Sequence, residues 1–380
     1  MMKTAISYWE QQHFFAYDVI IAGSGIVGLN AAIAIKSKNP KASVAILERG
    51  FLPSGASTKN AGFACFGSIS ELMEQEKNGG TALLYQLIER RWKGLLKLRK
   101  LLGDESLSYH NYGGYELFKT EDHQLAELCV AKIGHYNELI KDIVGQEDAF
   151  KTANNKISDF GFHDTALLIE NKLEAQIDTG KMMKALILKA TAIGIMIYNN
   201  CEVEELQEEG NYQILLSKHG KFKARQVLLS TNAFIKDLVP DLDVVPGRGQ
   251  VILTQPIPDL KIKGTFHYDK GYYYFRNIDQ RILLGGGRNL DIRGEETAVF
   301  GSTQLIQNAL KTLLKEVILP DTPFEIEQSW SGIMAFGHDL YPIVKSIRPG
   351  VFCAVRCNGM GIAMGTQTGE DAANMILPFL

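Results

Sequence analysis

The first fifty residues alternate short apolar runs with a segment of helical composition. Residues 17–21 (YDVII) form a β-branched run that ends in glycines, residues 30–38 (NAAIAIKSK) resemble a helix, and residues 43–48 (SVAILE) form a second apolar run. This order predicts a strand, a tight turn, a helix and a buried strand. Two strands joined through a helix in one sheet are expected to be parallel, with a right-handed crossover. The arrangement is typical of nucleotide-binding domains.

Helical periodicity follows on both sides of a strand-like run. Residues 80–102 and 121–144 repeat their apolar positions at helical spacing, and residues 113–120 between them predict a strand. Residues 51–68 are rich in Gly, Ser and Asn, which predicts an irregular loop. We therefore expect a partly helical unit inserted after the first strands.

The second half of the chain is richer in strands. Residues 179–193 predict a helix, and the apolar run at 226–231 predicts a buried strand of a parallel sheet. Further apolar runs between residues 244 and 293 predict an antiparallel sheet with a hairpin turn at Asn277–Gln280. Two more helices are expected, at 302–318 and, after a Gly-rich segment, within 357–377.

Charge and cysteine content narrow the functional classes. The 380 residues carry 40 Lys and Arg against 43 Asp and Glu, so neither nucleic acid nor an anionic membrane is an expected partner. Five scattered cysteines favour a reducing, cytoplasmic location. No uninterrupted run of about 18 apolar residues occurs, so no transmembrane segment is expected. The eight histidines lack paired ligand spacing, and no metal site is expected.

The strongest local motif is Gly23-x-Gly25-x-x-Gly28 between the first strand and helix, followed by Glu48 at the end of the next strand. The glycines permit the tight turn, the approach of a pyrophosphate to the backbone, and close packing of strand and helix. Glu48 would accept hydrogen bonds from ribose hydroxyls, and its charge argues against a 2′-phosphate. These residues predict a dinucleotide and leave NAD and FAD open.

Later segments resemble a known family. Gly55-Ala-Ser-Thr-Lys-Asn-Ala-Gly62 is similar to the second flavin-contacting loop of the D-amino-acid oxidase, glycine oxidase and sarcosine oxidase family. Cys201–Glu204 resembles its adenine-side strand, Leu228–Asn232 the strand that ends beside the pyrophosphate, and Cys357–Gly361 its closing signature. The resemblance covers nearly the whole chain and implies FAD as the cofactor.

The resemblance, combined with the dinucleotide motif, places FAD contacts in seven segments of the chain. The expected cofactor-binding residues are Gly23, Ser24, Gly25, Ile26, Val27, Gly28, Glu48, Arg49, Ala56, Ser57, Thr58, Asn60, Ala61, Gly62, Phe63, Val203, Thr231, Asn232, Gly332, Asn358, Gly359, Met360, Gly361 and Ile362.

The expected fold is α/β (α+β overall), with a Rossmann-like FAD-binding domain interleaved with a substrate domain that contains a mixed or antiparallel sheet and helices. Both domains are expected to be discontinuous. The FAD-binding domain is assigned to residues 1–80, 150–235 and 328–380, and the substrate domain to residues 81–149 and 236–327.

Three residues are candidates for catalysis. Arg356, just before the closing helix, would stabilise charge on the reduced flavin or bind a substrate carboxylate, and an ion pair with a surface acid is the alternative. Strand alternation places Tyr272 and Tyr274 on one face with Arg276, where the tyrosines would position the substrate. Aromatic residues in strands more often belong to a core, so that role also has a structural alternative.

The chain departs from the family at Met334. The resemblance implies an arginine at this position, five residues before Asp339, that binds the substrate carboxylate. A carboxylate in an enclosed site needs a paired cation. Either Arg356 or an arginine of the substrate domain replaces the missing residue, or the substrate carries no carboxylate near the reacting carbon.

The resemblance implies an FAD-dependent enzyme that oxidises the C–N bond of a small amine or amino acid. A hydride passes to flavin N5, the imine product hydrolyses, and oxygen or a quinone accepts the electrons. Two alternatives remain: an FAD-dependent 2-hydroxy-acid dehydrogenase, and a flavin-binding protein without turnover.

Overall fold

The computed structural model describes residues 6–380, which divide into two compact units. Residues 59–80 and 150–179, which the sequence analysis assigns to the FAD-binding domain, lie in the second unit, while residues 236–246 lie in the first. The assignment of cofactor and substrate to these units stays a prediction. The first unit comprises the described residues up to Thr58, Gly180–Pro246 and Met334–Leu380, and the second comprises Lys59–Thr179 and Gly247–Ile333.

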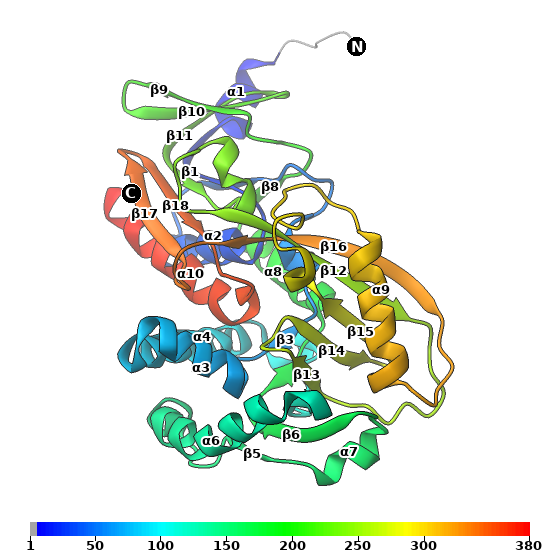
Figure 1. The fold of residues 1–380 in the computed structure, drawn as a ribbon. Coiled ribbons are helices and arrows are strands. Elements are labelled where there is room, and N and C mark those ends of the chain that lie inside the picture. The colour runs from blue at the N-terminus through cyan, green and yellow to red at the C-terminus, as the bar shows by residue number, and fades with distance from the viewer. Residues whose placement is uncertain (1–5) are drawn as a thin grey trace. The chain divides into compact units, whose positions relative to one another are not determined.

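The first unit contains a mostly parallel sheet (Figure 1). Its strands are β1 (Ala16–Ala22), β2 (Val44–Leu47), β8 (Met196–Tyr198), β9 (Glu205–Glu209), β10 (Tyr212–Ser217), β11 (Gly220–Leu229), β17 (Ile343–Arg348) and β18 (Val351–Val355). The main strand order is β17-β18-β11-β1-β2-β8, and β9 and β10 form a hairpin that extends from β11. β1 pairs in parallel with β11 on one side and with β2 on the other. The chain therefore builds outward from β1 in both directions, which makes the carboxyl end of β1 a topological switch point.

Two helices of this unit pack closely because of glycines. A Cβ on Gly365 would lie 2.7 Å from Ile26 Cγ2, and one on Gly369 would lie 2.7 Å from the Val27 carbonyl oxygen. These glycines allow the last helix to approach the helix that follows β1. The helices are α1 (Tyr8–Phe14), α2 (Ile26–Lys38), α8 (Thr179–Ala192) and α10 (Gly361–Ile376), with 3₁₀ turns η1 (Ala56–Thr58), η3 (Asn232–Asp237) and η6 (Leu377–Phe379).

The second unit is built on a mixed sheet. Its strands are β4 (Gly114–Lys119), β5 (Phe150–Thr152), β6 (Thr165–Asn171), β12 (Val245–Thr254), β13 (Thr265–Tyr268), β14 (Tyr273–Ile278), β15 (Arg281–Gly286) and β16 (Ile326–Phe336). Their order is β16-β12-β15-β14-β13-β4-β6-β5, and β13 is parallel to β4. A short separate pair joins β3 (Phe63–Ala64) to β7 (Ala175–Gln176). One core cluster of the unit includes Phe266, Phe275 and Leu310, all at most 1% exposed.

The helices of the second unit are α3 (Ile69–Gly79), α4 (Thr81–Leu102), α5 (Asp104–Leu107), α6 (His123–Val144), α7 (Asn155–Phe160) and α9 (Gln304–Leu313), with η2 (Thr120–Asp122), η4 (Arg288–Asp291) and the π-helical turn η5 (Leu314–Ile318). Residues of α3, α4 and α6 contribute to a second core cluster, which includes Leu84, Tyr136 and Phe150, whereas α9 contributes Leu310 to the first cluster. No helix within residues 6–380 is long and apolar enough to cross a membrane.

The predicted mixed α/β fold is confirmed, with local corrections. The hairpin between β14 and β15 turns one residue later than predicted, because Ile278 pairs with Arg281 and leaves Asp279-Gln280 as the loop. Asp279 has a φ of +51°, a conformation that Asp tolerates in tight turns. The sequence analysis did not predict the β17-β18 hairpin, whose outer strand mixes polar and apolar residues without a clear period.

Candidate functional site

The turn between β1 and α2 is shaped by glycines and by Ser230. Gly23 has a φ of +100°, which glycine adopts without strain, and its amide donates to the Leu47 carbonyl (2.8 Å). A Cβ on Gly28 would overlap the Gly23 carbonyl oxygen and lie 2.6 Å from Ser230 Oγ. Ser230 Oγ in turn donates to the Ala22 carbonyl (2.8 Å). The third glycine of the motif therefore permits close packing of turn and helix.

Glu48 follows β2 and is 6% exposed. Its Oε2 accepts hydrogen bonds from the Ser24 amide (3.0 Å) and hydroxyl (2.7 Å), while its Oε1 accepts one from the Gly50 amide (2.9 Å). A carboxylate oxygen has two acceptor sites, so Oε1 retains capacity for a ribose hydroxyl. The carboxylate thus lies beside the glycine turn, at the carboxyl ends of β1 and β2.

Polar groups of two residues in this unit have no hydrogen-bond partner among residues 6–380. Thr231 Oγ1, two residues after the end of β11, is one of these buried groups. The main-chain amide and carbonyl of Val203 form no hydrogen bond with any residue in the described range 6–380. Together with the glycine turn and Glu48, these groups fit a dinucleotide such as FAD, with its pyrophosphate at the turn and a ribose at Glu48.

The loop expected to contact the flavin is fixed by separate contacts in each unit. In the first unit, Ser57 Oγ accepts a hydrogen bond from the Ile26 amide (2.9 Å), so this first amide of α2 is already paired. In the second unit, Asn60 Oδ1 accepts from the Gly62 amide (2.9 Å) and the Thr179 hydroxyl (2.9 Å). The loop conformation therefore depends on residues distant in sequence, and its contact with FAD stays a prediction.

The closing segment before α10 has an unusual backbone. Arg356, Asn358 and Gly359 have φ values of +68°, +47° and +80°, and positive φ is uncommon for residues other than glycine. The Arg356 amide donates to Asn232 Oδ1 (3.3 Å), and Asn358 Nδ2 donates to the Asp339 carbonyl (3.2 Å). These contacts direct the chain into α10, whose first amides and helix dipole favour negative charge in front of them.

Arg356 itself is 3% exposed. Its guanidinium forms ion pairs with Asp243 and with Asp339 (2.6 Å), and donates to the Tyr341 carbonyl (2.9 Å). A hydrogen bond from the His338 amide, together with Arg356, lowers the pKa of Asp243. The geometry therefore favours the ion-pair alternative, in which Arg356 organises the closing segment. A direct contact with flavin or substrate stays a prediction.

The two tyrosine candidates do not share a face of the sheet. Tyr274 lies edge to face with Phe63, at 5.9 Å between ring centroids, and burial raises the pKa of Tyr274 to about 12. Tyr272 packs instead against the core cluster that contains Tyr273 and Phe275. The predicted grouping is wrong for Tyr272, because β14 begins only at Tyr273 and the strand alternation does not extend to the preceding residue.

Arg276 also points away from the core cluster of Tyr273 and Phe275. It is 6% exposed, and its Nη1 donates to the carbonyls of Gly62 (3.1 Å) and Ile177 (2.8 Å). No carboxylate of residues 6–380 lies within ion-pair distance of it, and burial lowers its pKa to about 10. Arg276 is thus a buried cation that holds the Gly62 turn.

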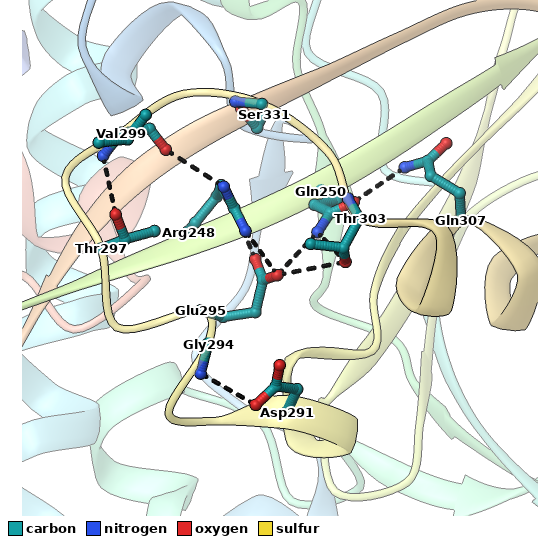
Figure 2. Close-up of polar contacts among 11 residues, drawn as sticks. Arg248, Gln250, Asp291, Gly294, Glu295, Thr297, Val299, Thr303, Gln307 and Ser331 are labelled. Atoms are coloured by element: carbon teal, nitrogen blue, oxygen red, sulfur yellow. Dashed lines mark hydrogen bonds and ion pairs between the residues drawn. The ribbon is translucent and has the colours of Figure 1, made fainter.

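Arg248 provides a contrast within the same unit. Figure 2 shows its guanidinium paired with Glu295 through two contacts of 2.8 Å, Nε to Oε2 and Nη2 to Oε1. Gln250 Nε2 donates to the same carboxylate (2.9 Å), and Glu295 is fully buried. This network ties β12 to the loop after η4. The charge of Arg248 is already neutralised, so a substrate carboxylate would gain little from it.

A second polar cluster surrounds His267 on β13. His267 Nε2 lies 2.7 Å from Glu174 Oε1, and Nδ1 lies 3.4 Å from Glu71 Oε2. Burial opposes the charge of His267, but Glu174, Glu71 and Glu116 outweigh it and raise its pKa to about 9. Sequence analysis missed this cluster, because its members come from segments that share no local motif.

Comparisons with known proteins identify the family of the chain. Residues 18–375 match the model of the DAO family, described as FAD dependent oxidoreductase. Glycine oxidase from Geobacillus kaustophilus is 24% identical over 95% of this chain and 93% of its own length. The crystal structure of glycine oxidase from G. kaustophilus (TM-score 0.73, 21% identity, 95% of each chain) and that of iminodiacetate oxidase from Chelativorans sp. BNC1 (TM-score 0.73, 19% identity, 95% of each chain) share the fold. The chain belongs to the DAO family of FAD-dependent oxidoreductases.

Proposed function

We propose that the protein oxidises the C–N bond of a small amine or amino acid. When bound, FAD supplies the acceptor for a hydride from the carbon next to the nitrogen. The observation that carries the proposal is the family match over residues 18–375, combined with a glycine turn and Glu48 arranged for a dinucleotide. The relatives named glycine oxidase and iminodiacetate oxidase support amino compounds as the substrate class.

Within this proposal, Arg356 is a positioning residue. By holding Asp243 and Asp339 it fixes the segment that leads into α10, and therefore the direction of the first amides of that helix. Those amides would stabilise negative charge that develops in front of them during the reaction. Tyr274 and Tyr272 are retained as proposed substrate-positioning residues, although Tyr274 packs against Phe63 and Tyr272 packs against the core cluster of Tyr273 and Phe275.

Replacing Arg356 tests this role. We expect Arg356→Ala to slow flavin reduction at saturating substrate by about 100-fold, the effect of losing a preorganised charge stabiliser, while FAD affinity changes much less. Arg356→Lys should recover part of the rate. Arg348→Ala is the matched control, because Arg348 pairs with Glu208 at the surface of the same unit. An unchanged reduction rate in Arg356→Ala would refute the role.

A substrate with a carboxylate needs a cation other than the arginine that the family resemblance implies at position 334, where this chain has Met334. Met334 Sδ lies 3.9 Å from where a Cβ on Gly359 would be, so an apolar thioether lies beside the closing segment. Arg356 and Arg248 are already paired with carboxylates. Arg276 is buried without one, and we propose it as the binding group for any substrate carboxylate. Otherwise the substrate is an amine without a neighbouring carboxylate.

The electron acceptor is proposed to be oxygen or a quinone. All five cysteines are buried, and their scattered positions support the proposed cytoplasmic location.

The decisive experiment is anaerobic reduction of the FAD-loaded protein. Primary amines, N-methyl amino acids, D- and L-amino acids and 2-hydroxy acids are added in turn while the visible absorption of the flavin is recorded. Bleaching by one amine class supports the proposal. If Arg276→Lys is no longer bleached by amino acids but is still bleached by amines without a carboxylate, the result supports the carboxylate role of Arg276. Bleaching only by hydroxy acids would establish the 2-hydroxy-acid alternative, and no bleaching by any compound would favour a flavin-binding protein without turnover.

A further inference from the structure

The second unit brings together three different metal-ligand side chains. Cys65, Glu174 and His267 are 4%, 1% and 5% exposed, and their donor atoms all lie within 4.8 Å of one another. They come from separate elements: Cys65 follows β3, Glu174 precedes β7, and His267 lies on β13. The sequence analysis expected no metal site, because none of these residues has a second ligand at the usual spacing nearby in the chain.

The donor set and its spacing suit a zinc ion. A sulfur, an imidazole nitrogen and a carboxylate oxygen are the ligand types that zinc takes in proteins. With metal–ligand bonds of about 2.0 to 2.3 Å, the ligand atoms of a tetrahedral ion lie roughly 3.3 to 3.8 Å apart. The Glu174–His267 contact of 2.7 Å is a hydrogen bond in the metal-free arrangement. For metal binding, Glu174 and His267 must move apart by about 1 Å, and all three donor atoms, now within 4.8 Å of one another, must adjust to the tetrahedral spacing.

The surrounding groups are arranged as supports for such ligands. Thr265 Oγ1 donates to Glu174 Oε1 (2.8 Å), and Glu71 lies on the Nδ1 side of His267, opposite the nitrogen that faces Glu174. A carboxylate on the second nitrogen of a ligating imidazole fixes the tautomer and the ring orientation. Phe63 packs edge to face on the same ring at 5.3 Å, which limits its rotation.

The charges around the ring are compatible with a cation. Glu71, Glu116 and Glu174 surround one imidazole, and no Lys or Arg of residues 6–380 forms an ion pair with any of the three carboxylates. Exchange of the thiol proton and one imidazole proton for a divalent ion leaves the net charge of this group unchanged, so the surrounding carboxylates do not oppose the ion.

We propose that Cys65, Glu174 and His267 bind a zinc-type divalent metal ion, with water in the fourth position. Binding releases two protons to solvent, one from the Cys65 thiol and one from Nε2 of His267, while Nδ1–H remains directed at Glu71. The ion joins β13 to the segments that precede β7 and follow β3. It therefore stabilises the short pair of β3, which contains Phe63, with β7, and this role does not depend on the proposed amine oxidation.

The test uses the FAD-loaded protein and zinc itself. The protein is treated with a chelator, incubated with Zn²⁺, passed through a desalting column and analysed by mass spectrometry for metal content. We expect about one zinc per chain and a zinc X-ray absorption spectrum with one sulfur neighbour and the rest nitrogen or oxygen. Failure of the native protein to retain stoichiometric zinc would overturn the proposal, and so would a shell without sulfur.

Variants locate the ion. Cys65→Ser and His267→Gln should lower zinc affinity by at least 100-fold, and Glu71→Gln by about 10- to 100-fold as a supporting residue. Cys129→Ser is the matched control, because Cys129 is also a buried thiol of this unit but lies outside the cluster. Equal zinc retention by Cys65→Ser and the native protein would overturn the assignment. If the variants fail to fold, the absorption spectrum of the native protein still decides the outcome.

Discussion

The glycine turn of the first unit and the His267 cluster of the second unit are both polar sites that include a buried carboxylate, but different features determine them. At the turn, the absence of side chains is decisive, since a single Cβ on Gly28 would overlap backbone. In the cluster, the side chains themselves are decisive, and strand register places His267 opposite Glu116. We therefore expect the turn to be most sensitive to substitutions that add atoms, and the cluster to be most sensitive to substitutions that change charge.

The largest effect is expected from adding one methyl group at the turn. Gly28→Ala would place Cβ against the Gly23 carbonyl and Ser230 Oγ, and the Gly23 backbone has little freedom to move because its amide donates to the Leu47 carbonyl. We expect a loss of about 3 kcal/mol or more in the free energy of unfolding, and loss of FAD binding. Denaturant unfolding and flavin content measure both.

Gly134→Ala is the control for that substitution. Gly134 lies inside α6, where a Cβ would meet no atom within 4 Å. Alanine has the higher helix propensity, so this variant should gain about 0.5 to 1 kcal/mol. Equal effects of the two substitutions would show that the close packing at Gly28 is unimportant.

The next effect is expected from the carboxylate beside the turn. In Glu48→Gln, an NH₂ group replaces one of the carboxylate oxygens that accept hydrogen bonds from the Ser24 and Gly50 amides. One of these amide donors then faces another donor and loses its hydrogen bond. We expect FAD affinity to fall at least about tenfold, with a stability loss of about 1 to 3 kcal/mol. Asp18→Asn provides the control, because Asp18 accepts a hydrogen bond from the Ser43 amide near the start of β1, away from the turn. Fluorescence titration with FAD separates the two variants.

The two sites also differ in how far the sequence predicts them. The glycine turn is encoded within one strand–turn–helix segment, so chain connectivity alone keeps Gly23, Gly25 and Gly28 together. The spacing of Glu48 adds a second strand whose pairing with β1 follows from the crossover rule. Ser230, 208 residues after Ala22, was placed near the turn only by family resemblance.

The His267 cluster was not predictable in this way. His267 and Glu174 are 93 residues apart, and they meet because β13 and β6, the strand that ends three residues before Glu174, both pair with β4. The partners of Arg356 were missed for the same reason, since Asp243 lies 113 residues away. Local patterns predict elements and turns, whereas contacts between distant side chains depend on a register that no local pattern specifies.

A pH-dependent effect is expected in the cluster. Burial raises the pKa of Glu116 to about 7, although hydrogen bonds from Ser70 oppose the shift. When the folded-state pKa of a carboxyl group is raised, the group makes its full contribution to the free energy of unfolding at pH values below its ordinary pKa of 4.5. That contribution is lost as the pH rises through the folded-state pKa. In metal-free protein, Glu116→Gln should therefore gain stability relative to the native chain between pH 5 and pH 8, by up to about 3 kcal/mol.

Glu170→Gln gives the opposite sign within the same sheet. Burial opposes ionisation of Glu170, but Lys156 and Lys151 outweigh it and lower its pKa. Its contribution is present above the ordinary pKa and is lost as the pH falls through the lowered value. Glu170→Gln should thus be destabilised at neutral pH, with a difference that shrinks in acid. Denaturant unfolding at several pH values measures both variants, and parallel curves would contradict the assignment.

The smallest expected effect is the difference in the free energy of unfolding between two hydroxyl deletions, one in each site. Ser230→Ala removes hydrogen bonds to main-chain carbonyls at the turn, for which about 0.5 to 1.5 kcal/mol is expected. Thr265→Val removes a hydrogen bond to the buried Glu174 carboxylate without changing side-chain shape, and bonds to charged groups contribute about 1.5 to 3 kcal/mol. Unfolding of metal-free protein should show the larger loss for Thr265→Val. The reverse order would mean that the charge of Glu174 is not the feature that distinguishes the cluster from the turn.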